Sequence, residues 1–114
     1  MLAVIFEVKP TQAGKAEYLK LAASLKEELS AFTGLLSIER FQSLIDEDKL
    51  LSLSFWRDEP SLEKWRNFMA HRFAQQKGKN ELFSEYRIRV CTVTRDYTEK
   101  KREEAPSDSN SFHA

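Results

Sequence analysis

The sequence predicts a single α+β domain with the ferredoxin-like element order βαββαβ, in which one antiparallel sheet carries two helices on the same face. Alternating apolar and polar residues mark the strands, and apolar residues at helical spacing mark the helices between them. A length of 114 residues with 41% hydrophobic residues supplies enough apolar surface for one core but not for two. We therefore expect one domain at residues 1–97 and a polar tail at residues 98–114.

The first strand and first helix are predicted from residues 2–32. Residues 2–8 are apolar on both faces at the beginning and polar on one face later, which is typical of a central strand. Pro10 and Gly14 then break the alternation. Apolar residues from Tyr18 to Phe32 recur at helical spacing with charged residues between them, so we expect an amphipathic helix of about five turns, closed by Gly34.

A hairpin follows, with strands over Leu35–Ser43 and Lys49–Trp56 and an acidic turn between them. In its second strand, the odd-numbered positions 51, 53 and 55 carry Leu, Leu and Phe, whereas the even-numbered positions 52, 54 and 56 carry Ser, Ser and Trp. One face of this strand is therefore apolar and the other is mixed.

The second helix is predicted to begin after Asp58, which can cap it, and to reach about Met69. A further helical piece over His71–Lys77 ends at Gly78, and the alternating run Tyr86–Tyr97 forms the last strand. The residues after Tyr97 are charged and then rich in Pro, Ser, Asp and Asn, so we expect disorder there.

Charge and cysteine content exclude several classes of function. Lys plus Arg and Asp plus Glu both number 18, so no net field attracts nucleic acid or an anionic membrane. No apolar run approaches the roughly 20 residues of a membrane-spanning helix. Cys91 is the one cysteine, and only His71 and His113 accompany it as soft ligands, which predicts no disulfide, no metal site and a reducing cytoplasm.

One face of the predicted sheet has no helix to cover it. That face would expose an apolar patch larger than monomers usually tolerate, so we expect a homodimer in which two copies pack sheet on sheet.

Several short segments in combination resemble one known family. They are Leu50–Trp56, the tripeptides that begin at Trp65 and Ala70, Ala74–Gly78, and Tyr86–Tyr97. Together they resemble the antibiotic biosynthesis monooxygenase (ABM) domain family across residues 1–97. The resemblance implies a dimeric α/β barrel with a pocket between the sheet and the helices of each protomer. It also implies, for some members, oxidation of polycyclic phenols by dioxygen without metal or flavin, so we expect a cofactor-independent monooxygenase acting on a small aromatic or phenolic substrate.

Candidate site residues lie on the second helix and at the end of the third strand. His71 is a candidate catalytic base because imidazole titrates near neutral pH. An aromatic wall and a set of donors could hold a flat substrate and an oxyanion: Trp56, Trp65 and Phe68 for the wall, and Arg66, Asn67 and Arg72 for the donors. The ordinary alternatives are a surface histidine, core aromatics and solvated helix charges.

Beside a structural or stress-related dimer whose pocket is vestigial, two other functions stay open. The first is a non-enzymatic dimeric module that binds a small hydrophobic ligand and needs only the aromatic wall. The second is haem degradation, which some members of the family carry out. It is disfavoured because those members place a ligand histidine about ten residues after the tryptophan that matches Trp65, and that position is Gln75 here.

Overall fold

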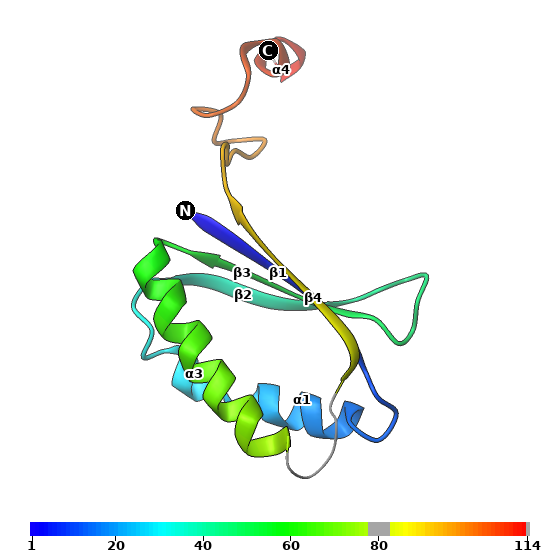
Figure 1. Ribbon diagram of the computed structural model, residues 1–114. Helices are drawn as coiled ribbons and strands as arrows, with labels where there is room; N and C mark the ends of the chain where they lie inside the picture. Colours follow the sequence, from blue (N-terminus) through cyan, green and yellow to red (C-terminus); the bar gives the residue numbers. More distant parts are fainter. Residues whose placement is uncertain (78–82, 114) are drawn as a thin grey trace.

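The computed structural model describes residues 1–77 and 83–113 and confirms the α+β architecture. The strands are β1 (Leu2–Pro10), β2 (Leu35–Gln42), β3 (Leu50–Trp56) and β4 (Phe83–Thr92), and the helices are α1 (Lys15–Ser24), α2 (Lys26–Leu29), α3 (Glu59–Lys77) and α4 (Ser107–His113). The strands form one antiparallel sheet in the order β2-β3-β1-β4. Figure 1 shows α1 and α3 on the same side of this sheet, which leaves its other face without a helix.

The central position of β1 follows from its pattern of residues. It pairs with β3 on one side and β4 on the other, so Phe6 lies opposite both Ser52 and Ile88. Strands in the middle of a sheet have neighbours on both edges, and this one is apolar on both faces over its first half. The prediction of a central strand is confirmed.

The first helix is shorter than its sequence pattern predicts. α1 ends at Ser24, and the four residues of α2 continue the chain after Leu25. Ser24 Oγ donates a hydrogen bond to the carbonyl oxygen of Leu21 at 2.7 Å. A serine hydroxyl that binds the preceding turn in this way disturbs regular helix geometry, so one predicted element becomes two.

The second helix is longer than predicted, because α3 runs without a break through the junction at Ala70. The segment after Pro60 contains no Gly or Pro up to Lys77, so nothing interrupts it. The predicted cap is confirmed: Asp58 Oδ1 accepts hydrogen bonds from the backbone N–H of Ser61 at 3.0 Å and from its hydroxyl at 2.7 Å. The predicted stop at Gly78 lies outside the described residues.

The last strand is displaced toward the N-terminus relative to the prediction, spanning Phe83–Thr92 rather than residues 86–97. Thr92 is the partner of Leu2, and the N–H of Val93 donates to the carbonyl oxygen of Met1 at 3.1 Å. β1 therefore has no residues left to pair with the chain beyond Val93, although alternation continues there.

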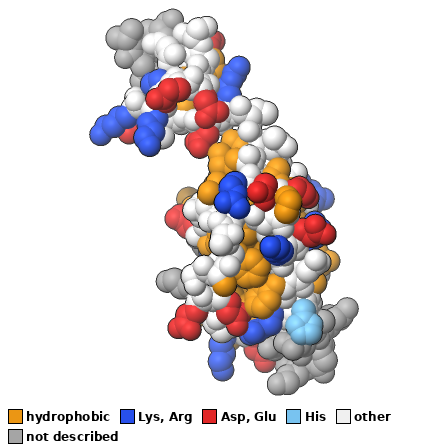
Figure 2. All heavy atoms as spheres, turned by 90° about the vertical axis from the view of Figure 1, so that its left-hand side faces the viewer, with side chains coloured by type: hydrophobic (Ala, Val, Ile, Leu, Met, Phe, Trp, Pro, Cys, Tyr) orange, Lys and Arg blue, Asp and Glu red, His pale blue; other side chains and the backbone are white. Residues whose placement is uncertain are grey.

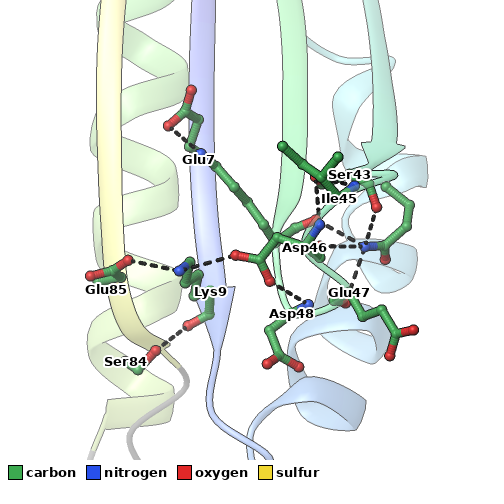
Figure 3. Close-up of polar contacts among 11 residues, drawn as sticks. Glu7, Lys9, Ser43, Ile45, Asp46, Glu47, Asp48, Ser84 and Glu85 are labelled. Carbon is green, nitrogen blue, oxygen red and sulfur yellow. Dashed lines mark hydrogen bonds and ion pairs between the residues drawn. The ribbon is translucent and has the colours of Figure 1, made fainter.

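Side-chain contacts attach the β2–β3 hairpin loop to the rest of the sheet (Figure 3). Gln42 Nε2 donates to four carbonyl oxygens of the loop at 3.0–3.3 Å. Lys9 Nζ lies 3.1 Å from Asp46 Oδ2 and 3.4 Å from Glu85 Oε1, so one ammonium group connects the loop, β1 and β4. The hydrogen bonds from Lys9 to Asp46 and Glu85 raise the pKa of Lys9, and the bond from Lys9 lowers the pKa of Asp46.

The tail has local structure that its composition did not predict. Arg102 Nε donates to Asn110 Oδ1 at 3.0 Å and its Nη2 donates to Ser109 Oγ at 2.7 Å, which holds α4 against the turn before it. Figure 1 shows α4 apart from the sheet and its helices. The domain boundary at residue 97 stays a prediction.

Candidate functional site

A cavity of about 880 Å³ lies between the sheet and the helices. Its floor comes from the helix-facing side of the strands and its opposite wall from α1, α2 and α3. The lining residues that matter below are apolar or aromatic for the most part, with a few polar groups among them: Val4, Phe6, Tyr18, Leu25, Arg40, Ser52, Ser54, Trp65, Arg66, Met69, Phe83, Glu85, Tyr86, Ile88 and Val90.

Small side chains on β3 create the space for this cavity. Ser52 and Ser54 occupy the middle of the sheet on its helix-facing side and are only 8% and 5% exposed. Serine at a position flanked by helices leaves a volume that Leu or Phe would fill. The mixed face predicted for this strand is therefore the one that faces the helices and the cavity.

The cavity is open along β4. Tyr86, Ile88 and Val90 all line it, yet they remain 65%, 55% and 50% exposed. Apolar side chains with this degree of exposure along one edge strand indicate an entrance rather than a sealed wall.

An aromatic group on one side of the cavity comes from three elements, β1, α1 and β4. Phe6, Tyr18, Phe83 and Tyr86 make edge-to-face contacts with ring centroids 5.3–6.2 Å apart. All four line the cavity. Their geometry is the one that aromatic pairs prefer, so this wall is well packed before any ligand enters.

Trp65 and Arg66 are the two predicted site residues that line the cavity. They follow one another on α3, and Trp65 stacks against Phe32 at 5.1 Å between ring centroids. The predicted placement of these two side chains beside a pocket is consistent with this structure, while their roles stay predictions.

Trp56 and Phe68 belong to the same aromatic cluster but do not line the cavity. Trp56 is fully buried, donates its indole N–H to Ser54 Oγ at 2.9 Å and lies 6.0 Å from Trp65. Phe68 lies 5.7 Å from Trp65 and packs against Leu21 and Leu25. The three aromatic residues of the predicted wall therefore lie in one cluster, but Trp56 and Phe68 contact Trp65 and not the cavity.

The three remaining predicted residues lie outside the cavity lining. His71 and Asn67 are exposed on α3, and His71 directly follows Ala70, which does line the cavity. Arg72 Nη1 lies 3.3 Å from Glu28 Oε1, and its guanidinium is 6.0 Å from the centre of the Phe68 ring. Arg72 therefore attaches α3 to α2 instead of facing a substrate.

Arg40, Ser52 and the Phe6–Tyr18–Phe83–Tyr86 group were not singled out by sequence reasoning as site residues. The signal for Arg40 is its parity: it shares the helix-facing side of β2 with Ile38, although it is exposed on this edge strand. Phe6, Tyr18 and the neighbouring residues Phe83 and Tyr86 lie far apart in the chain, and the pairing of β1 with β4 helps to bring them together.

One of the pKa shifts belongs to a group outside the cavity lining. Hydrogen bonds from the Ser61 hydroxyl and N–H lower the pKa of Asp58 at the start of α3.

Across residues 1–77 and 83–113, no three His, Cys, Asp or Glu side chains gather in a way that could hold a metal ion. No described helix combines the length and apolarity that crossing a membrane requires. Figure 2 shows acidic and basic side chains interspersed over the face in view, with hydrophobic side chains between them.

Comparison with known proteins identifies close similarity over most of the chain. Residues 1–77 match the sequence model of the family described as Antibiotic biosynthesis monooxygenase. A curated relative from Pyricularia oryzae, Jasmonate monooxygenase ABM, is 44% identical over 94 residues, which make up 82% of this chain and 44% of the relative. The chain thus spans less than half the length of that curated relative.

Solved structures share the fold at low sequence identity. A putative antibiotic biosynthesis monooxygenase from Deinococcus radiodurans has a TM-score of 0.71 at 11% identity, with 86% of this chain and 97% of that chain covered. A mutant of MhuD with two manganese protoporphyrin IX groups bound per active site has a TM-score of 0.67 at 14% identity, covering 86% and 99% of the two chains. These likenesses show the fold.

Proposed function

The chain belongs to the antibiotic biosynthesis monooxygenase family, and on that premise we propose that it is a cofactor-independent monooxygenase whose small aromatic or phenolic substrate binds in the cavity between sheet and helices.

The single observation that carries this proposal is the cavity itself. Its volume of about 880 Å³ lies within the roughly 300–1,000 Å³ of typical small-molecule sites. The edge-to-face group around Phe6 and Phe83 offers ring faces and edges to a flat ligand, and the open side along β4 gives it a way in. A site of this size with several polar groups in an apolar lining suits a small, mostly apolar substrate.

The proposed chemistry takes its electrons from the substrate. Oxidation of a CH₂ group next to a phenol ring consumes one dioxygen molecule: one oxygen atom becomes the new carbonyl oxygen, and the other leaves as water with the two hydrogens. No metal or flavin is needed for this balance. The protein has to remove a proton and stabilise the resulting oxyanion. Trp65 and Arg66 lie in the lining, and we keep His71 as the candidate base at the rim because it follows Ala70.

The test is oxygen uptake with a panel of anthrones and hydroquinones, with jasmonate added because the curated relative is named for it. Jasmonate is assayed with a two-electron reductant, since hydroxylation of an unactivated C–H bond requires one. Uptake that is stoichiometric with product supports the proposal, and absence of turnover across the panel contradicts it.

Histidine variants test the role of the candidate base. His71→Ala is expected to lower turnover at least about tenfold with the melting temperature little changed, as for loss of a positioned acid or base. His113→Ala, which changes the other histidine of the chain, is the matched control and should keep full turnover. Unchanged turnover of His71→Ala would remove this residue from the mechanism.

The non-enzymatic alternative predicts stabilisation by a ligand without turnover, which the same panel detects as a raised melting temperature. Haem degradation is disfavoured, because Gln75 takes the place of the ligand histidine. Mixing with hemin should therefore give no sharp Soret shift, and no loss of the Soret band with reductant and oxygen.

The proposal includes the surroundings of the protein. We place it in the cytoplasm as a homodimer, without nucleic-acid or membrane partners. The exposed free thiol of Cys91 and the zero net charge support this placement.

A further inference from the structure

The cavity has an excess of positive charge. Among the described residues that line it, the charged ones are Arg40, Arg66 and Glu85. The Glu85 carboxylate is paired with Lys9 at 3.4 Å, so it does not neutralise either arginine. Neither guanidinium forms a hydrogen bond or an ion pair with any residue in the described part of the chain. Two cationic groups therefore border an apolar cavity without a counter-ion from residues 1–77 or 83–113.

Arg40 belongs to a strip of hydrogen-bond donors along the cavity floor. It lies directly opposite Ser52 on the neighbouring strand, and both side chains are on the helix-facing side of the sheet. Ser52 is only 8% exposed and makes no hydrogen bond with another described residue. Ser54 accepts the indole N–H of Trp56, which leaves its own hydroxyl proton to donate. The Ser52 hydroxyl lines the cavity and has no hydrogen-bond partner among the described residues, so it is available to a ligand that brings an acceptor oxygen.

Arg66 approaches the cavity from the other side, because it lies on α3 whereas Arg40 lies on β2. Both are guanidinium groups, which present donors in a planar fork that matches the two oxygens of a carboxylate. Both arginines are exposed as well as lining the cavity, so their attraction for an anion comes from charge-assisted hydrogen bonds rather than from burial. A neutral ligand would leave both guanidinium groups without an anionic partner.

We propose that the cavity binds a small apolar carboxylic acid, with its carboxylate held by Arg40, Ser52 and Arg66 and its apolar body against the aromatic group around Phe6 and Phe83. The inference rests on the proposed function only in taking this cavity as the substrate site; the binding of the acid does not require turnover. It names a substrate class, an apolar body with a terminal anion, and assigns its recognition to specific residues.

Calorimetric titration with a matched pair of probes tests the proposal. 4-Phenylbutanoate and its methyl ester share the same aromatic body and differ in the charge of the head group. The acid is expected to bind at least about tenfold more tightly than the ester, because charge-assisted hydrogen bonds are stronger than neutral ones. Raising the salt concentration should weaken binding of the acid and leave binding of the ester unchanged.

Variants assign the preference to residues. Arg40→Met and Arg66→Met are each expected to weaken binding of the acid roughly tenfold without changing binding of the ester, and the double variant should lose the preference. Ser52→Ala should weaken binding of the acid by a smaller factor and leave binding of the ester unchanged. Arg95→Met makes the same chemical change at an exposed arginine outside the cavity lining and should bind both probes as the parent chain does.

The outcomes separate this inference from the proposed function. Equal affinity for acid and ester, no saturable binding of the acid, or equal losses of both probes in the arginine variants would each overturn the carboxylate site. A preference for the acid that depends on both arginines, in a protein that shows no oxygen uptake with any substrate, would uphold the site while the monooxygenase proposal fails.

Discussion

The backbone at Gly34 leaves no room for a side chain, because Ser61 lies against it. A Cβ atom at this position would overlap Ser61 Oγ and Cβ. The same residue accepts a hydrogen bond from the N–H of Arg57 at 2.8 Å, so the turn before β2 and the beginning of α3 are held together here. Close approach of two backbones is a use of glycine that no other residue can serve.

Gly34→Ala is therefore expected to lower the free energy of unfolding by roughly 1–3 kcal/mol, as for other overpacked sites, and urea denaturation measures it. Ser61→Gly removes both overlapping atoms, so the double variant should recover part of the loss. Ser61→Ala keeps the overlapping Cβ and serves as the matched control. Equal effects of the two Ser61 changes on Gly34→Ala would show that the overlap is not the cause.

Asp58 gives the stability of the protein a defined pH dependence. Its pKa is lowered from the ordinary value of 3.8, mainly by the Ser61 hydroxyl and then by the Ser61 N–H. A lowered folded-state pKa contributes stability above the unfolded value, and that stability is lost as the pH falls through the folded value. The relevant window therefore lies below pH 3.8.

Thermal unfolding of Asp58→Asn across that window tests this expectation. The amide oxygen of Asn can accept the same two hydrogen bonds but does not titrate there, so the melting temperature of the variant should fall less steeply between about pH 4 and 2. Glu63→Gln is the control, because Glu63 is exposed and forms no hydrogen bond or ion pair with a described residue. Parallel curves for the parent and Asp58→Asn would contradict the assignment.

Residue patterns predicted part of the cavity lining. Trp65 was singled out on the apolar side of its helix and Arg66 as a donor beside it, and both line the cavity, while their roles stay predictions. The Arg40–Ser52 pair was not found, because its significance depends on which strands are neighbours and which face the helices cover. The local residue pattern predicts which face of a helix or strand a side chain lies on. A binding site forms where the faces of several elements come together, and the local pattern does not predict that.

At the scale of elements, the existence of the strands and the ends of β2 and β3 were predictable, to within one residue, whereas the ends of β4 were not. Alternation located all four strands, but β4 ends at Thr92 because β1 offers no further partner, a fact of pairing that β4 itself does not encode. Likewise, the serine at the end of α1 ends that helix through a side-chain hydrogen bond. The ends of helices and strands depend on contacts that the periodicity of apolar residues does not reveal.

The tail should contribute little to the stability of the domain. The contacts around Arg102 join it to Ser109, to Asn110 and to the face of Tyr97, whose ring centre is 5.0 Å away, so they lie within or next to the tail. Ending the chain after Glu99 is expected to change the melting temperature by no more than a few degrees. Ending it after Thr92 also removes the bond from Val93 to Met1 and should cost more. A large loss from the shorter deletion would show that the tail docks on the domain.

At the scale of the whole molecule, the face of the sheet without helices is divided into two parts. The apolar part contains Ile5, Leu53 and Phe55, which are half-buried although no helix covers them. The other part carries ion pairs, in which Glu7 contacts both Lys49 at 3.3 Å and Arg89 at 3.4 Å. A two-fold axis through such a face would bury the apolar part against its copy.

The homodimer prediction follows from this face and is tested by light scattering. At micromolar concentration the mass should be twice the 13.3 kDa of one chain. Leu53→Asp places a charge in the apolar part and is expected to give monomers, because an unpaired carboxylate in an apolar interface is costly to desolvate. Leu19→Asp changes a leucine on α1 that is 43% exposed, away from this face, and should leave the dimer intact. Circular dichroism establishes that both variants are folded. A monomeric parent chain, or a Leu53→Asp variant that still dimerises, would show that the bare face is not where two copies meet.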